Sequence, residues 1–177
     1  MLIAQQKRNE NIAEYILYMW QIEDIIRSFN LSMTEIEAKI VSQYKVDEST
    51  RVKIKDWYQE IINDMRENGV VNEGHTKMTL SVLGELNFLH TGLMENKKET
   101  DYHSAFEKIE VYVNELREKA LRKNKNDIEI CFDGLYSYLL LKLKNKKINE
   151  ETSLAFREIS QFIAILAAKY KKAFTTN

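Results

Sequence analysis

Glu23 and His90 are the two residues whose types and positions point most directly to chemistry. A helix turns by about 100° per residue, so Glu23 projects between Ile12 and Ile16 on an apolar face. His90 falls on a similar apolar stripe, beside Leu86. A carboxylate among apolar side chains needs a partner, because an isolated buried charge is costly. Groups in such positions are candidates for a functional site.

The functional interpretation of these residues is a polar pocket inside a helical bundle. Its candidate lining residues are Glu23, His90, Tyr15 and Tyr136, and it would belong to a small-molecule-binding protein or an enzyme. The structural interpretation is that Glu23 and His90 make buried hydrogen bonds or reach solvent at the edge of the core. Structural networks also perturb titratable groups, so the structural interpretation is favoured. In an up-and-down bundle the two residues lie near opposite ends, and no catalytic role is assigned to either.

The histidines offer little support for metal chemistry. A di-iron carboxylate site needs Glu-x-x-His pairs on two helices, and no histidine here follows an acidic residue by three positions. Glu99, His103 and Glu107 have the i, i+4 spacing that could hold a metal. His103 falls on the polar side of its helix, where such charged neighbours are ordinary. We therefore expect no metal site and no cofactor.

Motifs for nucleophilic catalysis and phosphate binding are absent from the sequence. There is no G-x-S-x-G turn, P-loop or G-x-G-x-x-G. The single cysteine, Cys131, lies in the apolar string IEICFDGLY, so we expect a buried, inert thiol. A non-enzymatic protein is the favoured interpretation.

The N-terminal residues and the longest apolar run bear on location. The start MLIAQQKRNENIAEY has no apolar run behind a basic stretch, so no signal peptide is expected. The run from Ile159 to Ala168 is too short to span a bilayer. Together with the lone cysteine, these features predict a cytoplasmic protein that does not insert into membranes.

Basic residues gather at the predicted C-terminal ends of helices, and acidic residues gather at the starts. This arrangement compensates the helix dipole, at about 0.3–1 kcal/mol per well-placed charge. The formal net charge is −1, unlike the strongly basic surface of a nucleic-acid-binding domain. Nucleic-acid binding is therefore a minor alternative. The basic residues concerned are Arg117, Lys119, Arg122, Lys123, Lys125, Lys142, Lys144, Lys146, Lys147, Lys169, Lys171 and Lys172.

The elements that position these residues are helices. The 177 residues include no proline and five glycines, whereas sheet-containing folds use these residues for tight turns. Apolar periodicity predicts seven helices, with Ser32 and Asp47 as N-caps of the second and third and Gly69 at the end of the third. The sixth is apolar nearly all round, which predicts a central helix. The fold class is therefore all-α: a single-domain bundle of about seven mostly antiparallel helices, with a candidate subdivision near residues 69–75. The predicted helices span roughly residues 4–29, 32–44, 47–68, 76–95, 100–122, 127–143 and 149–170.

Two segments resemble a known family. They are the opening block LIAQQKRNENIAEYILYMWQIEDIIR and the later GELNFLH, residues Gly84–His90. Both are similar to sequences of an uncharacterised family of short, all-helical bacterial proteins, a domain of unknown function. The resemblance implies an all-α, cytoplasmic protein, and it transfers no activity and no catalytic residue.

Surplus apolar residues on two predicted helices point to protein interaction. Leu17 and Trp20 stand on the otherwise polar back of the first helix, and Leu154 and Ile165 form a second stripe on the last. They either contact another helix of the same chain or form an exposed patch for a partner. We expect a helical interaction or scaffolding protein that acts as a homodimer or binds another protein.

Three glycines lie inside predicted helices, namely Gly84, Gly92 and Gly134. Each costs near 1 kcal/mol relative to alanine. The favoured explanation is a close helix crossing at each glycine, and the alternative is a ligand that approaches the backbone.

Overall fold

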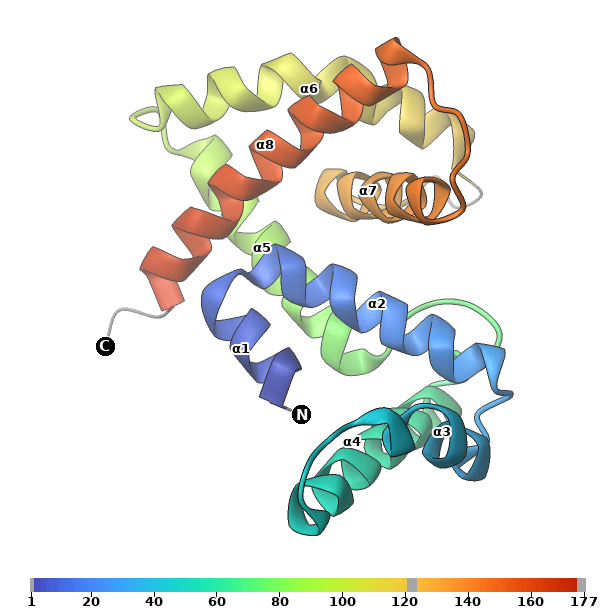
Figure 1. Cartoon of the computed structure of the whole chain (residues 1–177). Coiled ribbons are helices and arrows are strands. Elements are labelled where there is room, and N and C mark those ends of the chain that lie inside the picture. The colour runs from blue at the N-terminus through green and yellow to red at the C-terminus, as the bar shows by residue number, and fades with distance from the viewer. Residues whose placement is uncertain (1, 121–123, 175–177) are drawn as a thin grey trace. The chain divides into compact units, whose positions relative to one another are not determined.

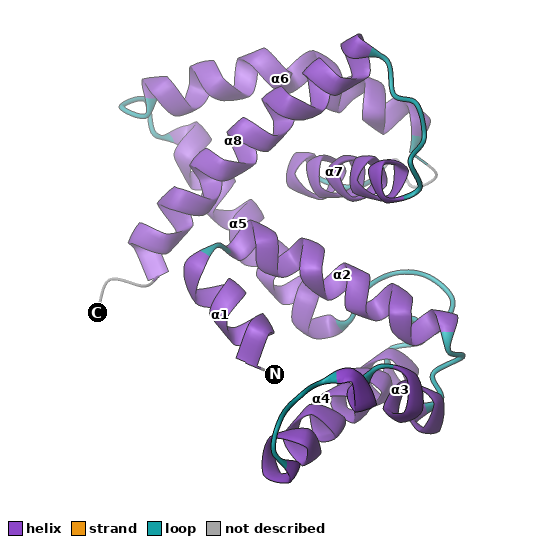
Figure 2. Ribbon diagram, viewed as in Figure 1, coloured by secondary structure: helices purple, strands orange, loops and turns teal. Residues whose placement is uncertain are grey.

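A computed structural model describes residues 2–120 and 124–174 of the chain. Within these residues there are eight α-helices, one 3₁₀ helix and no strand (Figure 1, Figure 2). The all-α prediction is confirmed. Of the predicted basic residues, Arg122 and Lys123 lie outside the described part. The elements are α1 (Leu2–Glu10), α2 (Ile12–Ser28), α3 (Met33–Lys39), η1 (Val41–Gln43), α4 (Glu48–Glu67), α5 (Lys77–Glu95), α6 (Thr100–Lys119), α7 (Asp127–Leu143) and α8 (Glu150–Phe174).

The chain divides into two compact units. The first comprises the residues up to 8 together with 14–82, and the second comprises 9–13 together with the residues from 83 onward. The division falls within α5, between Val82 and Leu83, so this helix contributes residues to both units.

The predicted helix over residues 4–29 is split at Asn11 into α1 and α2. Asn11 Oδ1 accepts a hydrogen bond of 3.0 Å from the backbone N–H of Ala13. An asparagine side chain that caps the following turn competes with continued helix behind it. The apolar periodicity runs on across this position, which is why the pattern predicted one helix instead of two.

The start of α3 and the start of α4 follow the capping residues that the sequence predicts. Ser32 Oγ accepts from the Glu35 amide at 3.4 Å, and Asp47 Oδ1 accepts from the Thr50 amide at 2.9 Å. The hydrogen bond from the Thr50 amide also lowers the pKa of Asp47 to about 2.

The end of α4 is fixed by Gly69, as its position in the sequence predicts. Gly69 has a φ of +68°, a left-handed conformation that glycine adopts without steric cost. The amide of Val70 donates to the Met65 carbonyl at 2.9 Å, and the Gly69 amide donates to the Arg66 carbonyl at 3.3 Å. This pair of bonds is a Schellman motif.

The first unit has its own apolar core. Buried side chains of α2, α3 and α4 fill it, in agreement with the 3.6-residue spacing of the sequence. Tyr58 belongs to this core, and burial raises the pKa of its hydroxyl. The fully buried members include Ile16, Met19, Ile26, Ile36, Ile61, Ile62 and Met65.

In the second unit, α6, α7 and α8 pack against one another. Gly134 lies in α7 where a Cβ atom would come within 2.8 Å of Leu116 and 3.0 Å of Phe156. The close crossing expected for this glycine is therefore present. The prediction that α7 is apolar all round and central holds only for its first half, because Leu141 and Leu143 are exposed.

Candidate functional site

Glu23 is fully buried in the first unit, and both of its carboxylate oxygens accept hydrogen bonds. Oε1 accepts from the Thr76 amide at 3.1 Å, from the Thr76 hydroxyl at 2.8 Å and from the Thr79 hydroxyl at 3.1 Å. Oε2 lies 2.7 Å from His75 Nδ1. A carboxylate only accepts, so Nδ1 of His75 carries the proton. We call these four residues the Glu23 network.

Local structure explains why these partners converge on Glu23. The Thr76 carbonyl accepts from the Leu80 amide, and the Thr76 hydroxyl lies 3.4 Å from the Thr79 amide, so Thr76 caps the start of α5. A negative carboxylate at a helix N-terminus is favourable because the helix dipole is positive there. The Glu23 network therefore fastens the start of α5 to α2.

His75 also stacks on Trp20. The two ring centroids are 3.9 Å apart and the rings are nearly parallel, at 8°. Trp20 is only 2% exposed as a result of its packing within the chain. Of the two alternatives for Trp20, this burial agrees with contact inside the chain and not with an exposed patch, because the connector that carries His75 returns over α2 and covers the ring.

His75, Thr76 and Thr79 are residues that sequence reasoning missed. The signal that could have found them is the pair of threonines three positions apart, directly after a histidine and at the predicted start of a helix. A partner was expected for Glu23, but the pattern did not identify which connector would return to it.

Tyr15 lies with Glu23 in the first unit and is buried. Burial is the main cause that raises the pKa of Tyr15, and the nearby Glu23 carboxylate adds to the increase while Arg8 opposes it. The two residues are therefore electrostatic neighbours, as the candidate pocket assumed.

His90 lies in the second unit, in an aromatic cluster. Its Nδ1 is hydrogen-bonded to the Tyr102 hydroxyl at 2.8 Å, and the rings of Phe106 and Phe162 are 5.0 and 6.0 Å away. Burial lowers the pKa of His90, which favours the neutral imidazole, and Asp127 opposes this effect. The structural interpretation of His90, a buried hydrogen bond, describes these contacts.

The four candidate pocket residues thus fall into two pairs. Glu23 and Tyr15 belong to the first unit, whereas His90 and the half-buried Tyr136 belong to the second. The hydrogen bonds described for Glu23 and for His90 end on residues of their own unit.

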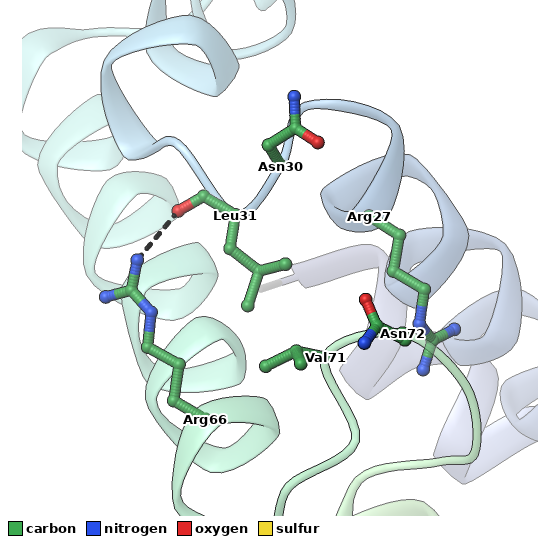
Figure 3. Close-up of a pocket in the computed structure, with 6 residues that line it drawn as sticks. All are labelled: Arg27, Asn30, Leu31, Arg66, Val71 and Asn72. Atoms are coloured by element: carbon green, nitrogen blue, oxygen red, sulfur yellow. Dashed lines mark hydrogen bonds between the residues drawn. The ribbon is translucent and has the colours of Figure 1, made fainter.

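A pocket with a volume near 480 Å³ lies in the first unit, and Figure 3 draws its lining. Arg66 donates to the Leu31 carbonyl at 3.1 Å. Arg27 donates to the carbonyls of Val70 and Gly74 and pairs with Asp24. Figure 3 shows the two guanidinium groups on opposite sides of the lining, with Leu31 between them. The lining residues are Arg27, Asn30, Leu31, Arg66, Val71 and Asn72, a set that could bind an anion and that includes no carboxylate.

The metal candidates are engaged in other contacts. Glu99 forms an ion pair with Lys169, and His103 Nε2 lies 3.0 Å from the Leu93 carbonyl oxygen. Across residues 2–120 and 124–174 no group of three metal-ligating side chains is found.

Several basic residues of the predicted positive clusters are also paired. Arg117 bonds the Lys125 carbonyl and the Asp127 carboxylate. Lys125 lies 2.6 Å from Asp133. These contacts hold Lys125 in place before α7 and neutralise part of the basic charge.

The second unit carries exposed apolar residues. Of the predicted interface, Leu154 and Ile165 are 41% and 39% exposed on α8, while Leu17 on α2, in the first unit, is half-buried. Phe88 on α5 is more exposed than either, at 78%.

Two of the three helical glycines flank Phe88. Gly84 and Gly92 are exposed, and a Cβ atom added at either would meet nothing within 4 Å. The close crossing expected at these two glycines is therefore absent from the described chain, unlike at Gly134. We call Gly84, Phe88 and Gly92 the α5 face.

No helix among the described residues combines the length and apolar character that a membrane crossing requires.

Comparisons with known proteins place the chain in a family. No curated protein and no solved structure matches the sequence. Residues 1–177 match the family described as a domain of unknown function (DUF4924), which confirms the resemblance to an uncharacterised helical family, and the chain belongs to that family.

Proposed function

We propose that this protein is a non-enzymatic, cytoplasmic interaction protein that self-associates as a homodimer. The observation that carries the proposal is the 78% exposure of Phe88 in the middle of α5. Single exposed apolar residues are common on protein surfaces and need no explanation by themselves. Phe88 differs from them because open glycines lie one turn away on either side.

The two glycines strengthen the case because they have a cost. Glycine inside a helix is less stable than alanine by near 1 kcal/mol, and among the described residues no atom lies within 4 Å of a Cβ added at Gly84 or Gly92. An exposed ring between two residues without side chains is a surface against which another helix can pack. A second copy of the chain would supply both the ring and the glycines.

Other exposed apolar residues support the same function less directly. Leu154 and Ile165 lie on α8 in the same unit and were expected at an interface from the sequence. Neither has open glycines beside it, so the α5 face is the primary contact in this proposal.

Light scattering coupled to size-exclusion chromatography tests the proposal. The full chain should elute with twice the mass of the 20.9 kDa monomer at high concentration. Phe88→Gln should raise the dissociation constant roughly thirtyfold, as expected when a central aromatic anchor worth about 2 kcal/mol is removed. Val111→Gln is the matched control, because Val111 is 56% exposed on a different helix and should leave the dimer unchanged. A monomer at every concentration would overturn the proposal.

A second candidate function is binding of a small anion in the Arg27 and Arg66 pocket. It is favoured by two guanidinium groups and two exposed asparagines around one cavity. Inorganic phosphate and citrate are the probes, with thermal denaturation as the measurement. Binding should raise the melting temperature of the full chain, and Arg66→Gln should abolish the increase. Arg157→Gln, at an exposed arginine of the second unit, should retain it; equal loss in both variants would refute the site.

A further inference from the structure

We infer that the Arg27 and Arg66 pocket binds a small organic acid, with the carboxylate of the acid on Arg66 and a neutral hydroxyl or amide group at the Arg27 end. This inference rests on the second candidate function, anion binding in this pocket, and it specifies the chemical class of the anion. The cavity, with a volume near 480 Å³, falls within the range of about 300–1,000 Å³ that is usual for small-molecule sites.

Arg66, on α4, is the arginine whose charge is available to a ligand. Its Nη2 donates to the Leu31 carbonyl at 3.1 Å, and this bond holds the guanidinium without neutralising its charge. Arg66 is exposed, and within residues 2–120 and 124–174 no carboxylate lies within ion-pair distance of it. Its Nε and Nη1 keep their N–H groups for a ligand. Arginine binds a carboxylate through two parallel hydrogen bonds, so Arg66 is the site for the acidic group.

Arg27, on α2, already has its charge neutralised within the chain. Its Nη1 forms an ion pair with Asp24 at 2.9 Å, and its Nη2 donates to the carbonyls of Val70 and Gly74. An anion at this end would gain little from Arg27, because the negative charge of Asp24 repels it. A neutral hydroxyl or amide group meets no such repulsion. The Arg27 end of the cavity therefore favours a polar group without charge.

The surface between the two arginines is apolar. Figure 3 shows the Leu31 side chain between the two guanidinium groups, with Val71 next to it and Asn72 on the Arg27 side. Asn72 is exposed and its carboxamide makes no hydrogen bond within the described chain, so it offers a donor and an acceptor to a neutral group. A ligand that matches all three parts has a short alkyl chain between a carboxylate and a hydroxyl or amide.

Charge favours a carboxylate over a phosphate as the acidic group. Arg66 provides one positive charge without a partner, whereas Asp24 balances the charge of Arg27. The lining contains no third charged residue. A carboxylate carries one negative charge, and a phosphomonoester carries about −1.5 to −2 at neutral pH. A monocarboxylic acid therefore leaves the occupied pocket neutral.

The wall that would contact the ligand is held in position by the chain itself. The hydrogen bonds from Arg27 to the Val70 and Gly74 carbonyls fix the connector on both sides of Val71 and Asn72. Little of this wall has to become ordered when a ligand binds, which lowers the free-energy cost of binding.

Organic acids of equal length test the assignment of the two ends. Isothermal titration calorimetry on the full chain at neutral pH compares, for each length from about three to six carbons, the ω-hydroxy acid with the unsubstituted acid and with the dicarboxylic acid. At the length that fits, the hydroxy acid should have a dissociation constant about fivefold lower than the unsubstituted acid, the effect of one net hydrogen bond. The dicarboxylate should bind no more tightly than the hydroxy acid, although it carries an additional charge.

Asp24→Asn sharpens this test because it removes the charge that neutralises Arg27. The variant should bind the dicarboxylate about tenfold more tightly than wild type does, and its affinity for the hydroxy acid should change by less than about threefold. Arg66→Gln should abolish the binding of both acids. Arg157→Gln, at an exposed arginine of the second unit, is the matched control and should bind both as wild type does. The melting temperature without ligand shows whether each variant is folded, and the comparison of acids on wild type does not depend on any variant.

The outcomes separate this inference from anion binding in general. The inference would be overturned, and an anion site would stand, if the dicarboxylate bound wild type more tightly than the hydroxy acid at every length. The same conclusion would follow if glycerol 3-phosphate bound more tightly than every carboxylate. Equal loss of binding in Arg66→Gln and Arg157→Gln would place the acid elsewhere and overturn both proposals. If no organic acid, phosphate or citrate binds, the second candidate function fails together with this inference.

Discussion

In the first unit, Glu23 is fully buried and both of its carboxylate oxygens are engaged by neighbours, whereas in the second unit Phe88 exposes most of its ring between two open glycines. The Glu23 network combines residue types that catalyse reactions elsewhere, yet its contacts hold α2 and a connector together. The α5 face contains no residue type suited to catalysis, yet its phenylalanine stays exposed in the described part of the folded chain. Residue type alone thus does not separate a side chain whose hydrogen bonds are made within the chain from one that remains exposed.

Among the substitutions that test this comparison, Glu23→Ala should have the largest effect on the free energy of unfolding. The substitution leaves the Thr76 amide, two threonine hydroxyls and His75 without their acceptor, which should lower the free energy of unfolding by about 3 kcal/mol. Urea denaturation monitored by circular dichroism measures it. Glu110→Ala, at an exposed glutamate on α6, is the matched control and should stay within about 0.5 kcal/mol of wild type. Equal stability of both variants would show that the Glu23 network does not hold the first unit together.

Gly134→Ala should have the next largest effect, in the second unit. The new Cβ would lie 2.8 Å from Leu116 and 3.0 Å from Phe156, so the α7 crossing would have to shift. Overpacking of this kind costs about 1–3 kcal/mol. Urea denaturation measures it, and Gly134→Leu should cost more. A stability gain instead would mean that α7 has more room than the crossing implies.

Much of the fold was predictable because its signals are local. The caps Ser32 and Asp47 and the terminating Gly69 each act through hydrogen bonds within a few residues, and the sequence identifies them. The break at Asn11 was missed because the apolar spacing continues across it. All of these predictions concern helix starts, ends and breaks, which depend on residues only a few positions apart in the sequence.

The candidate site was less predictable because it depends on contacts distant in sequence. The burial of Glu23 followed from helical spacing, but its partner His75 lies 52 residues away and comes from a connector. The two alternatives for Trp20 stayed open for the same reason, since the His75 ring that stacks on it comes from the returning connector. Phe88 was not singled out, because an apolar residue on a helix gives no sign by itself of whether a neighbour will cover it.

The pH dependence of stability tests the buried His90 of the second unit. Burial lowers the pKa of His90 in the folded chain, so the unfolded chain binds the proton first as pH falls below about 6.5. Stability contributed by the neutral imidazole is therefore present above that pH and decreases below it. The slope for one group cannot exceed about 1.4 kcal/mol per pH unit.

Urea denaturation between pH 7.5 and 5 measures this dependence in wild type and in His90→Gln. The glutamine does not titrate, so the variant should be less stable at pH 7.5 and should show the shallower slope. Parallel slopes would mean that His90 remains as accessible to protons in the folded chain as in the unfolded one, and the aromatic cluster would not be the closed environment that its contacts indicate.

Gly84→Ala and Gly92→Ala should change the free energy of unfolding least. The sign of the change should be opposite to that for Gly134→Ala. Each replaces a helical glycine over open space, so each should raise the free energy of unfolding of the monomer by about 1 kcal/mol. The same substitutions place a methyl group where the second copy would approach, so the dissociation constant should rise while the monomer becomes more stable. Urea denaturation in dilute solution and light scattering in concentrated solution measure the two quantities separately. If both alanine variants destabilised the monomer, the glycines would serve packing within the chain. The α5 face would then not be an exposed surface in contrast to the buried Glu23 network.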